Sequence, residues 1–166
     1  MNKRARQYLG LFSAVVVYYV IHEGAHLVFA LYTGTFRQIR FPGLGMQIDV
    51  YAQRMTDAQL GIFCLVGSVA TALAAYGLVF GADRLLKSSS KMFKACMYYV
   101  TLALLVLDPL YLSVLCGFFG GGDMNGIALL MPESAARALY GGLLLAHGVL
   151  FWRAVLPKYK KAFEKE

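Results

Sequence analysis

Two histidines and a glutamate stand within five residues of an otherwise apolar stretch, VIHEGAHLVF, from Val20 to Phe29. His22 and His26 are four positions apart, so on a helix they lie on one face, one turn from each other. Glu23 follows the first histidine and would lie beside the two imidazoles rather than between them. This H-E-x-x-H spacing lets two imidazoles bind one zinc ion while the glutamate serves as general base. The stretch therefore predicts a catalytic zinc site with His22 and His26 as ligands and Glu23 as the base.

A purely structural reading of the same residues is a buried polar cluster. Single histidines in apolar helices are usually packed and hydrogen-bonded. An ionised side chain in the middle of a bilayer, however, costs at least ~2.5–3.5 kcal/mol on insertion scales. A chain with only three histidines and four glutamates rarely places three ionisable groups at ligand spacing by accident. We therefore favour the metal site.

The third ligand has several candidates. Asp123 follows a run of glycines, where the backbone can bend a carboxylate towards the histidines, and it is the first choice. Asp108 precedes a proline inside an apolar segment and is the alternative third ligand. Of these two, the one that does not bind the metal is expected to orient a histidine, as metal sites commonly require. His147 is more simply a packed histidine, and Asp49 a solvated residue.

The composition indicates a membrane protein. Apolar residues make up 59% of the chain and charged residues 15%, whereas soluble proteins carry roughly 25% charged residues. Four apolar segments, at about 8–31, 58–81, 92–119 and 136–156, each reach the roughly 20 residues that span a bilayer. We expect an all-α polytopic membrane protein, one domain over residues 1–166. The net charge of +7 lies at chain ends and in one loop, which argues against nucleic-acid binding.

Two connections between these segments have patterns of their own. Residues 36–41 and 46–51 alternate in polarity on either side of Pro42-Gly43-Leu44-Gly45, which predicts a β-hairpin after the first helix. Thr56 or Asp57 could cap the second helix. Asp108-Pro109 predicts a bend in the third segment. The run from Gly120 to Gly126 predicts an irregular, glycine-rich break after it, which is tolerated at membrane depth only where protein or water surrounds it.

The basic residues favour one orientation. Twelve of the sixteen precede the first helix, lie between the second and third, or follow the fourth. The positive-inside rule therefore places both termini in the cytoplasm, and we expect the plasma membrane as the location. No cleavable signal peptide is expected, because cleavage after the first apolar run would remove HEGAH. The cysteines, Cys64, Cys96 and Cys116, are expected to be packing residues, since they lie far apart in apolar segments.

With its H-E-x-x-H inside an apolar helix, the chain resembles the site-2 protease family of intramembrane zinc metalloproteases. The predicted hairpin resembles the family's membrane-associated sheet, and Gly67-Ser-Val-Ala-Thr-Ala72 resembles its G-P-x-A-N motif, without the proline and asparagine. Gly-Gly-Asp123-Met-Asn-Gly126 loosely resembles the L-D-G motif that supplies the family's third zinc ligand. The family's Asn-Pro element has no clean match, and Asp108-Pro109 lies in its place. The resemblance covers about residues 8–130.

The resemblance implies a zinc-dependent intramembrane endopeptidase that cleaves a transmembrane segment of a membrane-protein substrate. A locally unwound substrate could add to an edge of the hairpin as a further strand. The family's catalytic face is usually near the cytosol, whereas the charge bias places the HEGAH end of the first helix on the opposite side. Alternatives are a non-catalytic membrane protein that binds a partner helix, and a metal-binding or transport protein. No appended regulatory domain fits in 166 residues, so any control would come from a membrane partner.

Overall fold

Long helices form where the sequence is apolar, and the first two begin after a residue whose side chain caps them. The computed structural model describes residues 2–41, 43 and 45–164. Helix α1 (Lys3–Tyr32) begins after Asn2, whose side chain accepts a hydrogen bond from the Ala5 amide. Helix α2 (Asp57–Leu85) begins after Thr56, which forms a reciprocal capping box with Gln59. Of the two predicted caps, Thr56 is therefore the cap and Asp57 the first helical residue.

The third and fourth apolar segments are each interrupted by a π-helical turn. Helix α3 (Lys91–Leu110) continues into the π-turn η2 (Tyr111–Leu115) and the 3₁₀ turn η3 (Cys116–Phe118). Directly after Asp108-Pro109, where a bend is predicted, the regular α-helix gives way to this π-turn. Helix α5 (Glu133–Leu150) passes through the π-turn η4 (Phe151–Val155) into α6 (Leu156–Glu164). Such single π-turns mark places where the regular hydrogen-bond ladder of a helix is adjusted.

The predicted hairpin and glycine-rich break are both present. Strands β1 (Phe36–Arg40) and β2 (Gln47–Val50) pair antiparallel, with Ile39 opposite Ile48 and an irregularity between Phe36 and Gln38. Of the predicted turn, Pro42 and Leu44 lie outside the described residues. The break after η3 holds three glycines with positive φ and a single short helix, α4 (Asp123–Ile127).

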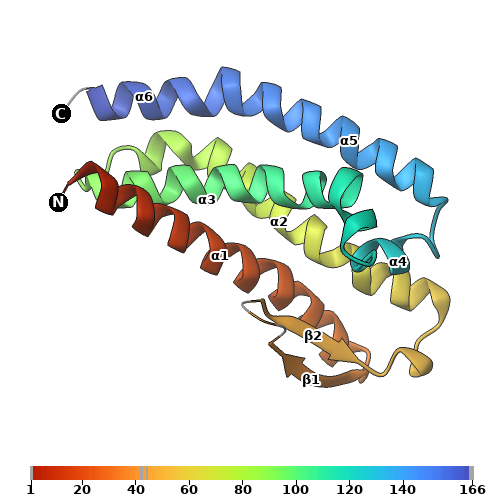
Figure 1. Cartoon of the computed structure of the whole chain (residues 1–166). Coiled ribbons are helices and arrows are strands. Elements are labelled where there is room, and N and C mark those ends of the chain that lie inside the picture. Colours follow the sequence, from red (N-terminus) through yellow and green to blue (C-terminus); the bar gives the residue numbers. More distant parts are fainter. Residues whose placement is uncertain (1, 42, 44, 165–166) are drawn as a thin grey trace.

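Figure 1 shows α1, α2 and α3 packed side by side, with α5 and α6 along the other face of α3. The hairpin and α4 lie at one end of the bundle, and both chain ends lie at the other. Two apolar clusters fill the interior. One, near the hairpin and α4, includes Ile48, Phe63 and Met124. The other, towards the chain ends, includes Leu104 and Leu105.

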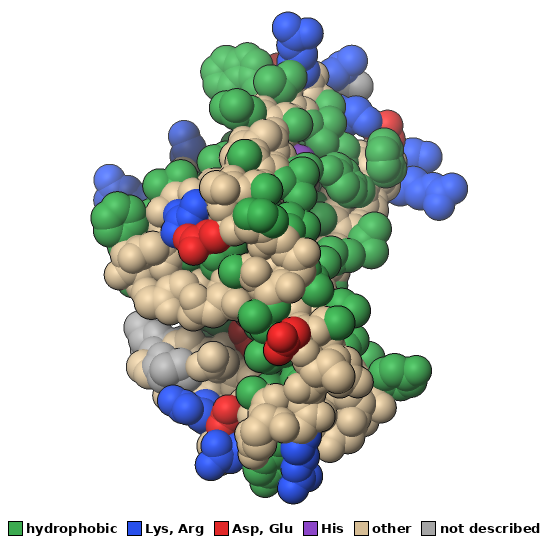
Figure 2. Space-filling model, turned by 90° about the vertical axis from the view of Figure 1, so that its right-hand side faces the viewer, with side chains coloured by type: hydrophobic (Ala, Val, Ile, Leu, Met, Phe, Trp, Pro, Cys, Tyr) green, Lys and Arg blue, Asp and Glu red, His purple; other side chains and the backbone are tan. Residues whose placement is uncertain are grey.

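The outer surface of the bundle is apolar. The four spans Lys3–Tyr32, Asp57–Leu85, Lys91–Phe118 and Glu133–Glu164 are each long and apolar enough to cross a membrane. Large side chains such as Phe12, Leu73, Phe80 and Leu145 are at least 66% exposed. Figure 2, which views the end of the bundle that carries α4, shows hydrophobic side chains spread over that face rather than gathered in a single patch. The exposed apolar side chains along the spans are compatible with helices surrounded by lipid.

The three cysteines form no disulfide with one another. Cys64 and Cys116 are buried among apolar residues, and Cys96 is half-buried. Their placement agrees with the predicted packing role.

Candidate metal centre

Helix α1 places the three residues of the motif on its buried side. His22, Glu23 and His26 are between 3% and 8% exposed, although α1 as a whole carries many exposed apolar side chains. The imidazoles lie directly against α2 at Gly67, where a Cβ atom would lie 2.6 Å from His26 Nε2 and 2.8 Å from His22 Nε2. A glycine is therefore needed here to leave space for the two rings.

Three ligand-type atoms converge at one point between α1 and α4. His22 Nε2 lies 3.1 Å from His26 Nε2 and 3.1 Å from Asp123 Oδ2. His26 Nε2 lies 3.5 Å from the same carboxylate oxygen. Tetrahedral zinc with bonds of ~2.0–2.1 Å places its ligand atoms roughly 3.3 Å apart. The triangle formed by the three atoms therefore has the size of one face of a zinc coordination tetrahedron.

The outer ring nitrogen of each histidine faces an oxygen atom of the protein. His26 Nδ1 donates to the carbonyl oxygen of Phe63 at 2.7 Å, which leaves a lone pair on Nε2 in the neutral ring. His22 Nδ1 lies 3.1 Å from Asp108 Oδ1, at ion-pair distance but without the alignment of a hydrogen bond. Metal-bound histidines commonly have such partners, which fix the tautomer and direct the lone pair. His26 Nε2 thus carries the lone pair that a ligand needs, and His22 Nε2 faces the same point.

Asp108 is engaged on every side and faces His22 rather than the convergence point. Its carboxylate is 2% exposed and accepts from the Tyr18 hydroxyl at 2.5 Å and from the Thr71 hydroxyl. Tyr18 also stacks on the His22 ring, with the ring centroids 5.3 Å apart. Asp108 therefore positions the His22 ring from its Nδ1 side.

Asp123 reaches the histidines because the glycine-rich break turns the chain towards them. Gly122, directly before it, has φ +51°, a conformation that other residues rarely adopt. A Cβ atom there would also lie 2.3 Å from the Tyr111 hydroxyl. Asp123 then begins α4, which packs on α2 and on α5. Of the two aspartates, the structure brings Asp123 to both Nε2 atoms and Asp108 to His22 Nδ1.

Glu23 lies beside the histidines. Its side chain offers an oxygen within 4.8 Å of ligand atoms of both His22 and His26. Its Oε2 atom accepts a hydrogen bond of 3.0 Å from the Ile48 amide of β2. By these distances Glu23 and Asp123 are both near the two rings, but Asp123 makes the shorter contacts. Asp123 is therefore the better candidate for the third ligand, and the Glu23 carboxylate, hydrogen-bonded to the Ile48 amide, lines the cavity next to the two rings.

A cavity of about 620 Å³ opens at the site. One wall carries His22, Glu23, His26 and Asp123, and the other is formed by Gly45–Ile48 of the hairpin. Tyr18, Phe63, Tyr111 and Phe119 complete an aromatic lining. The cavity is large enough for a short stretch of extended peptide between the hairpin and the histidines.

The two remaining candidates lie elsewhere. His147 is hydrogen-bonded through both ring nitrogens, to Leu105 O and to the Tyr76 hydroxyl, at 2.7 Å each. Asp49 accepts from Gln38 at 3.1 Å and lies 3.5 Å from Arg37 within the hairpin. Neither side chain is available to the histidine pair.

Four groups of the site were not anticipated from the sequence. They are the Tyr18 and Thr71 hydroxyls, the Phe63 carbonyl and the Ile48 amide. Tyr18 carried a signal, since it precedes His22 by one helical turn and so shares its face. The Phe63 carbonyl and the Ile48 amide carried no signal in the sequence, because every residue type has a backbone carbonyl and nearly every one a backbone amide.

Comparison of the chain with protein-family models, with curated proteins and with solved structures found no match.

Proposed function

We propose that this chain is a multi-pass membrane protein that acts as a zinc-dependent intramembrane endopeptidase, similar to site-2 proteases. The observation that carries the proposal is the convergence of His22 Nε2, His26 Nε2 and Asp123 Oδ2 within 3.1–3.5 Å of one another. The His26 ring, which donates from Nδ1 to Phe63, brings a lone pair to this point, and Asp123 brings a carboxylate oxygen, so a cation shared by the three atoms would be stabilised there. Two imidazoles and one carboxylate form the ligand set of many catalytic zinc sites, which keep a fourth position open.

The residues around the triad fit the same chemistry. When bound, zinc would supply the Lewis acidity that activates water and polarises a peptide carbonyl. Glu23 lies within 4.8 Å of the histidines, so its carboxylate would take the proton of an attacking water and pass it to the leaving amine. Phe63 and Asp108 hold the imidazoles in place throughout.

The hairpin offers a way to hold the substrate. Ile48 lies opposite Ile39 of β1, but its amide points to Glu23 and not into the β1–β2 ladder. The edge of β2 away from β1 therefore lines the cavity, and an extended peptide could pair with it by strand addition. Such a peptide would compete for the Ile48 amide and release Glu23 beside the scissile bond. The substrate class is then a transmembrane segment that unwinds locally before cleavage.

The membrane part of the proposal is supported by the four spans and by the exposed apolar side chains on them. A location in the plasma membrane, with both termini in the cytoplasm, rests on the distribution of basic residues.

The contact between Glu23 and Ile48 also favours a second candidate. In a non-catalytic membrane protein that binds a partner helix, Glu23 would serve only to fasten β2 to α1. The two candidates differ in what Glu23→Gln does to turnover.

The test uses the full chain in detergent or in reconstituted bilayers. We expect about one zinc per chain, and cleavage of a panel of single-span membrane proteins when the chain is co-expressed with them. Glu23→Gln should keep the zinc and slow cleavage by about 10²–10⁴-fold, the usual contribution of a general base. A well-folded parent protein that binds no zinc on reconstitution would refute the proposal that the chain is a zinc protease. Zinc binding without any Glu23-dependent cleavage would favour the second candidate.

A further inference from the structure

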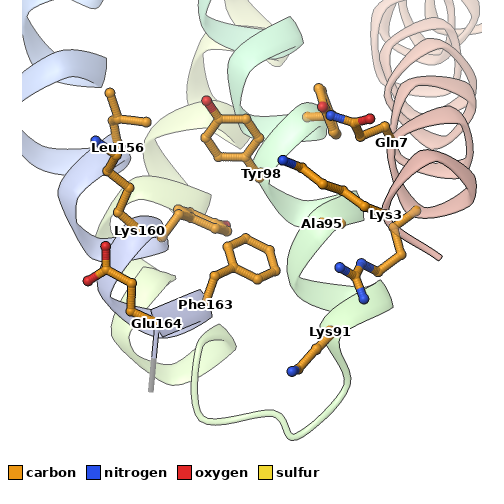
Figure 3. Close-up of a pocket in the computed structure, with 12 residues that line it drawn as sticks. Lys3, Gln7, Lys91, Ala95, Tyr98, Leu156, Lys160, Phe163 and Glu164 are labelled. Atoms are coloured by element: carbon orange, nitrogen blue, oxygen red, sulfur yellow. The ribbon is translucent and has the colours of Figure 1, made fainter. Parts of the chain in front are cut away.

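A second cavity lies at the opposite end of the bundle from the metal centre. It has a volume of about 560 Å³ and is formed between the first turns of α1 and α3 and the last turns of α6. Figure 3 shows Lys3 reaching into it from α1, Lys160 and Phe163 bordering it on α6, and Tyr98 of α3 between them. Both chain ends are at this end of the molecule in Figure 1.

The charged side chains that line this basic pocket are mostly positive. Among the residues that the structure describes, Lys3, Arg6, Lys91 and Lys160 line it together with one carboxylate, that of Glu164. They come from three helices that meet only in the folded chain. Their convergence on one cavity is more than the scattered positive charge that flanks membrane helices in general.

Below the charges at the rim the pocket is lined by aromatic and apolar side chains. Lys3 and Lys91 are the first residues of α1 and α3, and Glu164 is the last of α6. Two turns further into the bundle the lining consists of Tyr98, Tyr99 and Leu156, and the pocket also contacts Tyr159. Tyr98 and Tyr159 pack edge to face, with centroids 5.4 Å apart, which gives the pocket a firm floor.

The change from charged side chains at the rim to aromatic and apolar side chains further in matches the change in polarity along a phospholipid. Cations at the rim would meet a phosphate, tyrosines would lie at the level of the glycerol, and apolar side chains would meet the acyl chains. A free phosphate would use the cations but not the apolar wall. Basic pockets between spanning helices are known to hold anionic head groups.

We propose that this pocket binds the phosphate group of an anionic phospholipid. The proposal rests on the membrane insertion included in the proposed function, but on neither the zinc site nor proteolysis. It assigns a second ligand site to the chain, more than half the bundle away along α1 from His22.

The test measures lipid binding by native mass spectrometry of the full chain released from a nonionic detergent. Phosphatidylglycerol and phosphatidylcholine are titrated separately, and inorganic phosphate and glycerol 3-phosphate are added as competitors. The pocket variant is Arg6→Gln with Lys160→Gln. The matched control is Lys87→Gln with Lys161→Gln, which removes the same charge from a neighbouring cavity at the same end.

We expect phosphatidylglycerol to bind in preference to phosphatidylcholine, and the pocket variant to bind it at least about tenfold more weakly. The control should change binding less than twofold. Equal losses in both variants, or equal binding of both lipids, would overturn the proposal. Displacement of the lipid by millimolar inorganic phosphate would assign the pocket to a free phosphate and overturn the lipid source.

Zinc content is measured on the same preparations. Retention of zinc by the pocket variant, and of lipid binding by Glu23→Gln, would show that the two sites stand independently. Failure of the lipid site would then leave the proposed protease unaffected. Failure of the zinc site or of proteolysis would likewise leave the lipid site unaffected.

Discussion

The Nε2 atoms of His22 and His26 lie 3.1 Å apart, and in His26 the ring hydrogen is on the other nitrogen, donated to Phe63. The His26 ring therefore brings a lone pair to this point, and Asp123 brings a carboxylate oxygen 3.1 Å from His22 Nε2. We expect one zinc ion shared by the two imidazoles and this carboxylate.

Removing either imidazole should therefore abolish metal binding. We expect His22→Ala and His26→Ala to lower the zinc content from about one per chain to near zero, measured by inductively coupled plasma mass spectrometry. His147→Ala is the matched control, since His147 is equally buried but is bonded to Tyr76 and Leu105. Loss of zinc in the control alone would contradict the assignment.

The two aspartates should differ in the size of their effects. Asp123→Asn removes the ligand charge and should abolish stoichiometric zinc binding. Asp108→Asn leaves the three ligands in place but weakens the support of His22, so we expect affinity to fall about 10–100-fold. Competition with a chelator of known affinity measures both. The reverse ranking would make Asp108 the ligand.

The Thr71 hydroxyl should matter through Asp108. Thr71→Val keeps the shape of the side chain but removes a donor to a buried carboxylate, at a cost of about 1–3 kcal/mol in stability. Zinc affinity should fall as well, because Asp108 is less firmly held. Thr101→Val is the control, since Thr101 is equally buried and donates to Met97 O, away from Asp108. It should leave zinc affinity unchanged, and an equal fall in both variants would show a general loss of packing.

Much of the fold could be predicted because its signals are local. The apolar segments, the Thr56 cap and the alternation around the hairpin turn each lie within a few neighbouring residues. The spacing of His22 and His26 is local in the same sense, since one helical turn fixes their common face.

The choice between Asp108 and Asp123 could not be made this way. It depends on the direction in which the chain leaves η3, set by three glycines with positive φ, and on how α3 is rotated against α1. The sequence names both aspartates as candidates, but only the packing decides that one faces Nδ1 and the other Nε2. The Ile48 amide is unpredictable for a simpler reason, since its role depends only on the position of the backbone.

The membrane topology is testable without reference to the zinc site. With four spans we expect the two termini on the same side, and the distribution of basic residues predicts that this side is the cytoplasm. Reporter proteins that are active only in the cytoplasm, fused to either terminus, should both be active, whereas a fusion in the hairpin after Arg40 should not. Opposite results for the two termini would exclude four spans, and activity of the hairpin fusion alone would invert the orientation.

The last prediction concerns the close approach of α2 to the histidines. A Cβ atom at Gly67 would lie 2.6 Å from His26 Nε2, so Gly67→Ala should push the imidazoles apart and strongly reduce zinc binding. Gly77→Ala is the control, because Gly77 lies in the same helix with nothing within 4 Å of its Cβ position. The control should be neutral or slightly more stable, since alanine favours helix over glycine by about 1 kcal/mol. Zinc content and thermal unfolding are measured on both variants. A Gly67→Ala protein that keeps one zinc per chain with unchanged affinity would show that the rings are not confined against α2.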